Sequence, residues 1–381
     1  MKKNYDVIVV GGGAIGSAAG YYLGKTGLET LMIDMYTPPH SKGSHHGETR
    51  LIRHASAEGT QYVPLVLRAQ ELWSDLEKQS NEKLFYPSGT LLAGEENAPF
   101  IADSVSVAKR YSLPLESLSA KQIEHRFPQF TVPNTYQSFF EATSGVLMST
   151  KILLAFRQLI AHYNKVNTLY DTKVISIKSI HNGVEVITSR GSFFASKVII
   201  SAGGWSERLL DNIELPLQTM RKTFGWFKAV GNEFYPPNLP CFYFNFNKRK
   251  YYGFPNISGS GIKIGRNDSE IPMEPDTKEE FGEYSEDEED LIYFMKKIIP
   301  AVSRNFKKGE TCFITKTPDK NFIIDSHPEN DNIIIATGFS GHGFKYSIVI
   351  GEILSQLIKE GKTTYDISTF SINRQFKENT Q

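Results

Sequence analysis

One turn near the start of the chain constrains its fold more than any other feature. Residues 5–10 form a short β-branched apolar run, which is typical of a buried parallel strand. Residues 11–16 read Gly-Gly-Gly-Ala-Ile-Gly and match the pattern Gly-x-Gly-x-x-Gly. Small apolar residues follow, and a second apolar run ends at Asp34, 23 residues after Gly11. Strand, glycine turn, helix, strand and carboxylate in this order predict a dinucleotide-binding unit.

Each part of this motif has a physical role toward a dinucleotide. Gly11 allows the tight turn, Gly13 lets the backbone approach a pyrophosphate, and Gly16 lets the helix pack closely on the strand. The helix N-terminus presents unpaired N–H groups and a positive dipole end to the phosphates. Asp34 is spaced to accept hydrogen bonds from ribose hydroxyls, which favours FAD or NAD over NADP. The alternative is a glycine-rich turn without a ligand.

Composition narrows the class of protein. A length of 381 residues predicts two domains or one large α/β unit. Lys+Arg and Asp+Glu both number 42, and a net charge of zero argues against nucleic acid or a membrane surface as partner. Two cysteines, Cys241 and Cys312, suit a reducing cytoplasm rather than a disulfide framework. Residues 7–24 carry no charge, but six of these 18 are glycine, so we expect a nucleotide fold rather than a signal peptide or membrane span.

The rest of the chain reads as two excursions from the nucleotide-binding unit. Residues 86–144 are rich in turns, and residues 216–300 are aromatic, with alternation at 241–246 and 261–265 that favours antiparallel strands. We therefore expect an α/β fold in which a discontinuous Rossmann-type domain carries a second, α+β substrate domain built on a mainly antiparallel sheet. The Rossmann-type domain is assigned to residues 1–85, 145–215 and 305–381, and the substrate domain to residues 86–144 and 216–304.

Local patterns predict individual elements. Apolar residues recur at helical spacing from Leu65 to Leu76, with Trp73 expected in the core. Residues 149–160 predict another helix. Strands are expected at 174–180 and 184–188, on either side of an Asn-Gly hairpin signal. The acidic run after Ser285 predicts a capped, dipole-matched helix start without a catalytic role.

Two polar segments carry side chains suited to a ligand. Residues 45–54 contain three histidines and two arginines, which predicts a cationic wall beside the nucleotide; the alternative is a solvated loop. Residues 332–337 predict a buried strand that runs into a glycine loop at 338–345 and then a helix at 348–358. The N–H groups of this second loop would face an anionic or electron-rich group, with Lys345 beside it.

These segments together resemble a known family: monomeric sarcosine oxidase and N-methyltryptophan oxidase, flavoproteins of the D-amino-acid-oxidase-like superfamily. The resemblance covers essentially the whole chain. The stretches that carry it are 43–54 (Gly-Ser-His-His-Gly-Glu-Thr-Arg-Leu-Ile-Arg-His), 251–255, 322–325, 338–345 and 366–374. Together they are far more specific than the glycine motif alone.

The resemblance implies a cofactor and a reaction. It implies FAD linked covalently through the sulfur of Cys312, although residue chemistry alone favours an inert buried thiol at that position. It implies oxidation of an N-methyl amino acid, with sarcosine as first choice: sarcosine, O2 and water give glycine, formaldehyde and H2O2. N-methyl-L-tryptophan or another secondary amino acid, such as proline, is the alternative. We also expect a cytoplasmic monomer with no nucleic-acid or membrane partner.

The resemblance also implies roles for individual side chains. Arg53 and Lys345 match the clamp for the substrate carboxylate, which charge-assisted hydrogen bonds would hold. Arg50 and His46 match positions beside the flavin ring, Lys263 matches the lysine implicated in oxygen activation, and Tyr252 matches a pocket tyrosine. The implied cofactor contacts are Gly11, Gly13, Gly16, Asp34, Ser44, Thr49, Gly341, Gly343 and Cys312.

One departure from the family pattern affects the substrate pocket. Asn267 stands where the relatives carry a histidine, and asparagine forms hydrogen bonds but does not titrate near neutral pH. The expected substrate contacts are therefore Arg53, Lys345 and Asn267. Two other classes stay open on the sequence: a nicotinamide-dependent dehydrogenase on the same nucleotide fold, and a flavin-binding protein without turnover.

Overall fold

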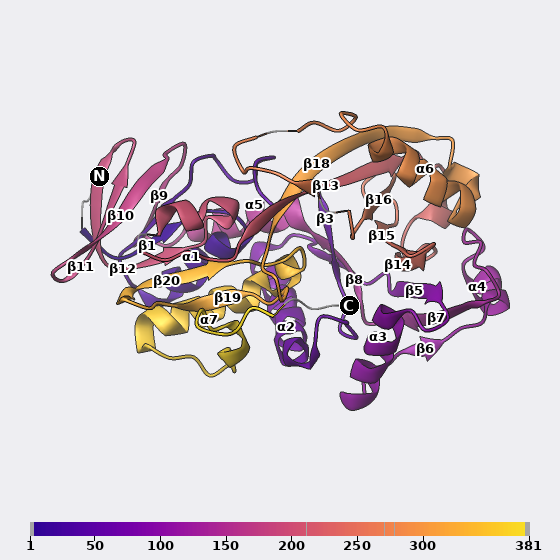
Figure 1. Cartoon of the computed structure of the whole chain (residues 1–381), viewed down its shortest axis with the longest axis horizontal. Helices are drawn as coiled ribbons and strands as arrows, with labels where there is room; N and C mark the ends of the chain where they lie inside the picture. The colour runs from indigo at the N-terminus through magenta and orange to yellow at the C-terminus, as the bar shows by residue number, and fades with distance from the viewer. Residues whose placement is uncertain (1–3, 211, 270, 278, 378–381) are drawn as a thin grey trace.

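The computed structural model describes residues 4–210, 212–269, 271–277 and 279–377. Figure 1 shows two lobes, and two long strands, β13 (Gln218–Phe227) and β18 (Phe306–Lys316), pass from one lobe toward the other. One lobe contains both the indigo start and the yellow end of the chain. Among the described residues, no helix has the length and apolar composition needed to cross a bilayer.

The first lobe is built on an eight-stranded sheet. Its parallel centre confirms the predicted strand–turn–helix–strand unit, with β1 (Asn4–Val10) between β12 (Gly191–Ile200) and β2 (Thr30–Ile33). The predicted hairpin is also confirmed. The remaining strands are β9 (Val166–Leu169), β10 (Val174–Ile180), β11 (Gly183–Thr188), β19 (Ile323–His327) and β20 (Asn330–Thr337).

Helices pack on this sheet at close range. Helix α1 (Ala14–Thr26) contacts α7 (Ser347–Glu360) and α5 (Ser149–Ile160). The α1–α7 approach depends on Gly351, because a Cβ there would lie 2.5 Å from the Ala18 backbone. The predicted helix around residues 65–76 is confirmed as α2 (Val63–Ser80), with Trp73 fully buried. Trp73 Nε1 donates a hydrogen bond to the carbonyl of Lys345, so this helix also holds the second glycine loop.

The second lobe is built on a nine-stranded sheet. Its strand order is β17-β13-β16-β15-β14-β5-β7-β6, and β18 pairs with β13. The new strands are β5 (Thr90–Glu95), β6 (Glu116–Ser117), β7 (Tyr136–Glu141), β14 (Cys241–Phe246), β15 (Arg249–Phe254), β16 (Ile262–Arg266) and β17 (Ile271–Pro272). The helices of this lobe are α3 (Pro99–Arg110), α4 (Ala120–Arg126) and α6 (Glu286–Ile298). A small sheet of β3 (Thr49–Ile52), β4 (Phe85–Tyr86) and β8 (Gly145–Met148) completes the described strands.

Strand β14 pairs antiparallel with β15, as predicted, and it also pairs parallel with β5, which enters this sheet from residues 86–144. One predicted detail differs in the structure. The side chain of Ser285 makes no capping hydrogen bond, because its backbone is already helical; the acids in the first turn of α6 still match the helix dipole. The division into domains stays a proposal. Because β18 pairs with β13 of the second lobe, the boundary proposed at residue 305 would move to the end of β18, after Lys316.

A buried ion pair joins α6 to β13. Arg221 is 1% exposed, and its guanidinium donates two hydrogen bonds, of 2.8 and 2.7 Å, to the carboxylate of Asp287. Such a pair is costly to break, because the remaining partner keeps its charge in a buried site.

Removing the carboxylate therefore tests how strongly α6 is held. We expect Asp287→Ala to lower the free energy of unfolding by about 3–5 kcal/mol, measured by urea denaturation. Glu288→Ala, on an exposed position of the same helix, is the matched control and should change it little. If both variants unfolded at similar urea concentrations, the Arg221–Asp287 pair would not stabilise the fold.

Candidate active site

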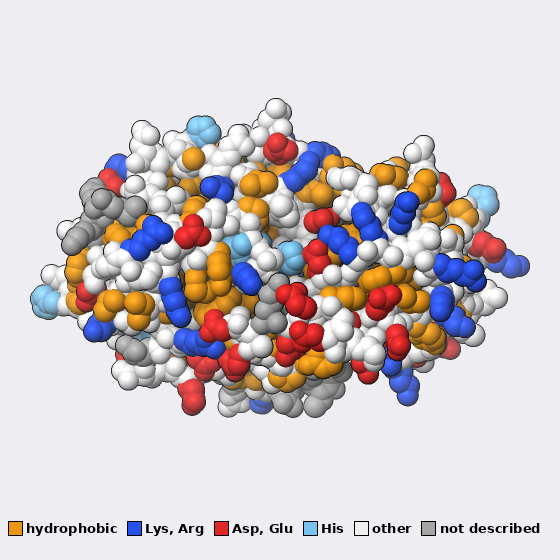
Figure 2. Space-filling model, turned by 90° about the horizontal axis from the view of Figure 1, so that it is seen from above, with side chains coloured by type: hydrophobic (Ala, Val, Ile, Leu, Met, Phe, Trp, Pro, Cys, Tyr) orange, Lys and Arg blue, Asp and Glu red, His pale blue; other side chains and the backbone are white. Residues whose placement is uncertain are grey.

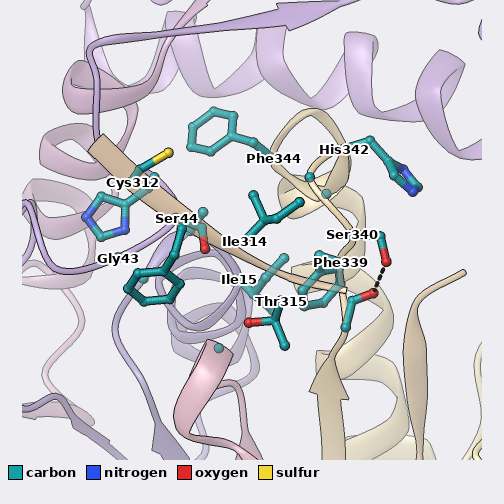
Figure 3. Close-up of a pocket in the computed structure, with 18 of the residues that line it drawn as sticks. Ile15, Gly43, Ser44, Cys312, Ile314, Thr315, Phe339, Ser340, His342 and Phe344 are labelled. Carbon is teal, nitrogen blue, oxygen red and sulfur yellow. Dashed lines mark hydrogen bonds between the residues drawn. The ribbon is translucent and has the colours of Figure 1, made fainter. Parts of the chain in front are cut away.

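A cavity of about 890 Å3 lies where the glycine turn, the segment of residues 40–53, the β13–β18 pair and the loop 338–345 meet. Figure 3 shows Cys312, Ile314, Phe344, Ser44 and Ile15 among the side chains that line this cavity. The predicted residues that line the cavity are Gly11, Gly13, Asp34, Ser44, Arg50, Arg53, Tyr252, Asn267, Cys312, Gly341, Gly343 and Lys345. The structure therefore brings together most of the side chains singled out in the sequence.

Four predicted residues lie behind the cavity wall and contact residues that form it. Gly16 is packed against Gly11, and the carbonyls of His46 and Thr49 accept hydrogen bonds from Arg50. The ammonium group of Lys263 lies 4.5 Å from the ring centre of Phe224, which lines the cavity. Direct contact of these four with a cofactor or substrate therefore stays a prediction.

The glycine turn has the geometry that a phosphate cradle needs. Gly11 has φ +99°, and a Cβ on Gly16 would lie 1.7 Å from the Gly11 carbonyl oxygen, so both positions require glycine. A Cβ on Gly13 would meet only the ring of His45, at 3.6 Å. Because no side chain caps α1, its first N–H groups stay available to a ligand at the cavity surface.

Asp34 shapes this turn as well as facing the cavity. Its carboxylate accepts hydrogen bonds from the N–H groups of Gly12, at 2.5 Å, and Tyr36, at 2.7 Å. Each carboxylate oxygen can accept a further hydrogen bond, so capacity for ribose hydroxyls remains.

The basic segment is arranged around Arg50. Its guanidinium donates hydrogen bonds to the carbonyls of Ser44, His46 and Thr49, at 2.5 to 2.7 Å, which holds residues 44–50 in a tight loop. The imidazole of His46 instead pairs with Glu310, at 2.8 Å. Burial raises the pKa of Glu310, but hydrogen bonds from His46 and Lys308 outweigh it and bring that pKa to about 2. Glu310 thus anchors His46 to β18, two residues before Cys312.

Arg53 and Lys345 converge on one carboxylate that the sequence did not single out. Lys345 Nζ lies 2.9 Å from Glu58 Oε1, and an Arg53 nitrogen lies 3.9 Å from the same oxygen. Burial opposes ionisation of Glu58, yet the two cations hold its pKa near 2. Burial lowers the pKa of Lys345, and Glu58 opposes that shift. Burial raises the pKa of Glu141, the other carboxyl that interacts with both cations, so with Glu58 ionised the group keeps one net positive charge, which suits one further carboxylate.

Cys312 lies on β18 directly opposite Lys222 of β13, and its sulfur faces the cavity (Figure 3). Burial raises the pKa of its thiol, whereas Arg50, Lys263 and Lys222 lower it. The other cysteine, Cys241, is fully buried away from the cavity lining, and burial raises its thiol pKa to about 12. A thiol facing the cavity among cations is the more reactive of the two, because cations favour the thiolate.

Lys263 is buried without an acidic partner in the described part of the chain. Its ammonium group donates hydrogen bonds to the carbonyls of Gly47 and Thr49, and three aromatic rings surround it. Burial and the nearby Arg50 lower its pKa well below the usual value for lysine. A negative charge formed close by would favour its protonated form.

Tyr252 and Asn267 belong to an aromatic and polar face that includes a residue missed in the sequence, Tyr243. Tyr243 and Tyr252 lie opposite each other on β14 and β15. The amide of Asn267 donates a 2.8 Å hydrogen bond to the hydroxyl of Tyr243, and Arg53 lies 4.8 Å from the centre of the Tyr243 ring. Alternation along 241–246 marked this segment as a strand, but only the tertiary structure shows which face meets the cavity.

The sequence model of the FAD dependent oxidoreductase (DAO) family matches residues 6–357. The chain belongs to this family. The nicotinamide-dependent alternative is therefore set aside. The cavity fits FAD on structural grounds, because the glycine turn leaves free N–H groups for a pyrophosphate and Asp34 remains able to bind a ribose.

Similar proteins span almost the whole chain. Monomeric sarcosine oxidase of Arthrobacter sp. (strain TE1826) is 47% identical over 98% of this chain and 97% of its own. N-methyl-L-tryptophan oxidase of Yersinia pestis (strain Pestoides F) is 40% identical over 97% of this chain and 99% of its own. Among solved structures, NikD, an amino acid oxidase of nikkomycin biosynthesis, superposes with a TM-score of 0.86 at 22% identity, covering 97% and 98% of the two chains. This last similarity confirms the fold.

The open space at Gly13 gives a direct test of the FAD site. We expect Gly13→Ala to lower the FAD content of the purified protein by at least about tenfold, equivalent to ~1.4 kcal/mol, while the unfolding temperature of the apoprotein stays unchanged. The added methyl group would occupy the space that a phosphate needs, while making only an ordinary van der Waals contact with His45. Gly16→Ala is the contrasting control, which should lose both FAD and fold. Normal flavin absorbance in Gly13→Ala would contradict this placement of the phosphates.

Proposed function

We propose that this FAD-dependent oxidoreductase oxidises N-methyl amino acids with O2, and that sarcosine is within its substrate class. The observation that carries the proposal is the convergence of Arg53 and Lys345 at one end of the cavity, with Glu58 leaving one positive charge unbalanced. The 47% identity to a monomeric sarcosine oxidase supports it. The products from sarcosine would be glycine, formaldehyde and H2O2.

The chain's own residues would bind and orient the substrate. Arg53 and Lys345 hold its carboxylate by charge-assisted hydrogen bonds. Tyr243 and Tyr252 form a wall beside the clamp, and this wall limits how the amine and its methyl group lie. When bound, FAD would supply the redox chemistry, as a two-electron acceptor that O2 reoxidises.

Three further residues would assist the cofactor. Arg50 and His46, fixed by the loop carbonyls and by Glu310, would favour negative charge on the reduced ring. Lys263 would favour electron transfer to O2, because its lowered pKa lets it gain a proton when negative charge forms nearby. These roles rest on the resemblance to the family together with the buried positions of the side chains.

N-methyl-L-tryptophan is the second candidate substrate. The 40% identity to an N-methyl-L-tryptophan oxidase favours it, and so do the aromatic rings along the cavity. A flavoprotein without turnover is the remaining class, and it would give no peroxide with any secondary amino acid. Cytoplasmic location and a monomeric state remain predictions of the sequence.

The clamp can be tested separately from the cofactor. We expect Lys345→Met to raise the KM for sarcosine by about 10- to 100-fold, because one charge-assisted hydrogen bond of ~1.5–3 kcal/mol is lost. FAD content should be unchanged, as read from flavin absorbance. Lys359→Met, on the exposed end of α7, is the matched control and should resemble the parent. Parallel loss of FAD and activity in Lys345→Met would refute the clamp.

We also propose that FAD is attached through Cys312, whose sulfur faces the cavity. After denaturation in acid, we expect the yellow colour to stay with the protein pellet in the parent and in Cys241→Ala, and to move to the supernatant in Cys312→Ser. The reason is that only a covalent bond survives loss of the fold. Colour in the supernatant of the parent would exclude the link while leaving an FAD enzyme.

A further inference from the structure

Three polar side chains share the cavity-facing side of neighbouring strands beside the clamp. Tyr243 is on β14, Lys250 is on β15, and Asn267 follows β16 directly. Tyr243 faces Tyr252 across the strands, and Lys250 is two residues from Tyr252, so alternation places Lys250 on the same side. The N–H of Asn267 donates to the Lys250 carbonyl at 2.7 Å, which keeps the two residues adjacent. All three line the cavity, and we call them the polar wall.

The polar wall presents unused hydrogen-bond donors. Asn267 donates to the Tyr243 hydroxyl at 2.8 Å, which leaves the phenol hydrogen free for another acceptor. Burial raises the pKa of Tyr243 to about 12, so this donor persists at neutral pH. Within the described part of the chain, the ammonium group of Lys250 has no hydrogen-bond or ion-pair partner. An ammonium and a phenol that line the same cavity favour a carboxylate as their ligand.

The polar wall adjoins the clamp rather than forming a separate site. Arg53 lies 4.8 Å from the centre of the Tyr243 ring, so the same tyrosine contacts both regions. An amino acid whose α-carboxylate occupies the clamp would therefore extend its side chain along Tyr243 toward Lys250. Sarcosine has no side chain and would leave these donors without a ligand.

We propose that the preferred substrate is an N-methyl amino acid with a second carboxylate on its side chain, bound by Tyr243 and Lys250. This inference rests on the proposed function and names the substrate class of that same site.

Two other charges line this end of the cavity. Arg266 is already paired with Asp268, at 2.9 Å, and Asp103 on α3 is the acid that opposes the assignment.

The test compares substrates that differ in one charge. The purified, yellow holoenzyme is assayed for H2O2 and for anaerobic bleaching of the flavin with sarcosine, N-methyl-L-alanine, N-methyl-L-aspartate and N-methyl-L-asparagine. The last two have nearly the same shape, so their ratio of kcat/KM reports the charge alone. We expect the aspartate derivative to exceed the asparagine derivative by at least about tenfold, the range of a charge-assisted hydrogen bond.

Variants then assign the preference to the polar wall. In Lys250→Met, the ratio of kcat/KM for the aspartate and asparagine derivatives should fall to about one, and Tyr243→Phe should lower it several-fold. Lys248→Met is the matched control, because this lysine lies on the exposed β14–β15 turn, and it should keep the parent ratio. FAD content and unfolding temperature identify any variant that has failed to fold.

The outcomes separate this inference from the function on which it rests. A ratio near one in the parent, a preference for the neutral derivatives, or a ratio that survives Lys250→Met would overturn the inference. The proposed function would still stand if sarcosine were oxidised. Absence of peroxide and of flavin bleaching with all four compounds would instead overturn the proposed function.

Discussion

The ladder between β13 and β18 is the constraint on which the site depends. It extends from Gln218 paired with Lys316 to Phe227 paired with Phe306, and it fixes a late segment of the chain in the nine-stranded sheet. The next strands, β19 and β20, return to the eight-stranded sheet that contains the glycine turn. Cys312 therefore lines the same cavity as the glycine turn, and segments from both ends of the chain enclose this cavity.

Buried cations give this enclosure its chemical character. Arg53, Lys345 and Lys263 are each at most 5% exposed, and burying a charge is costly unless it is paired or hydrogen-bonded. Glu58 compensates the first two, whereas backbone carbonyls compensate the third. On the face drawn in Figure 2, by contrast, basic and acidic side chains are interspersed. Buried positive charge therefore distinguishes the cavity from this face.

Local patterns predicted the elements of the fold well. Residues 149–160 and 174–180 coincide with α5 and β10, and the core position of Trp73 followed from helical spacing. One prediction was wrong for a local reason: Ser285 does not cap its helix, because its own backbone is already helical. Strand β14 pairs antiparallel with β15, as predicted, but it also takes β5 as a parallel neighbour. A strand partner of this kind depends on where another part of the chain lies, which no local pattern records.

The sequence by itself determined the glycine turn, Asp34 and the family, because backbone sterics and the spacing of a dinucleotide motif act within a few tens of residues. The basic character of residues 45–54 could also be recognised from the sequence. Only the tertiary structure decided that Glu58 would sit between Arg53 and Lys345, and that Tyr243, Lys250 and Asn267 would share one face. Glu58 and Lys345 are 287 residues apart, and strand pairing brings the other three side chains to one face, so these charges and hydrogen bonds arise from packing and strand register rather than from a local motif.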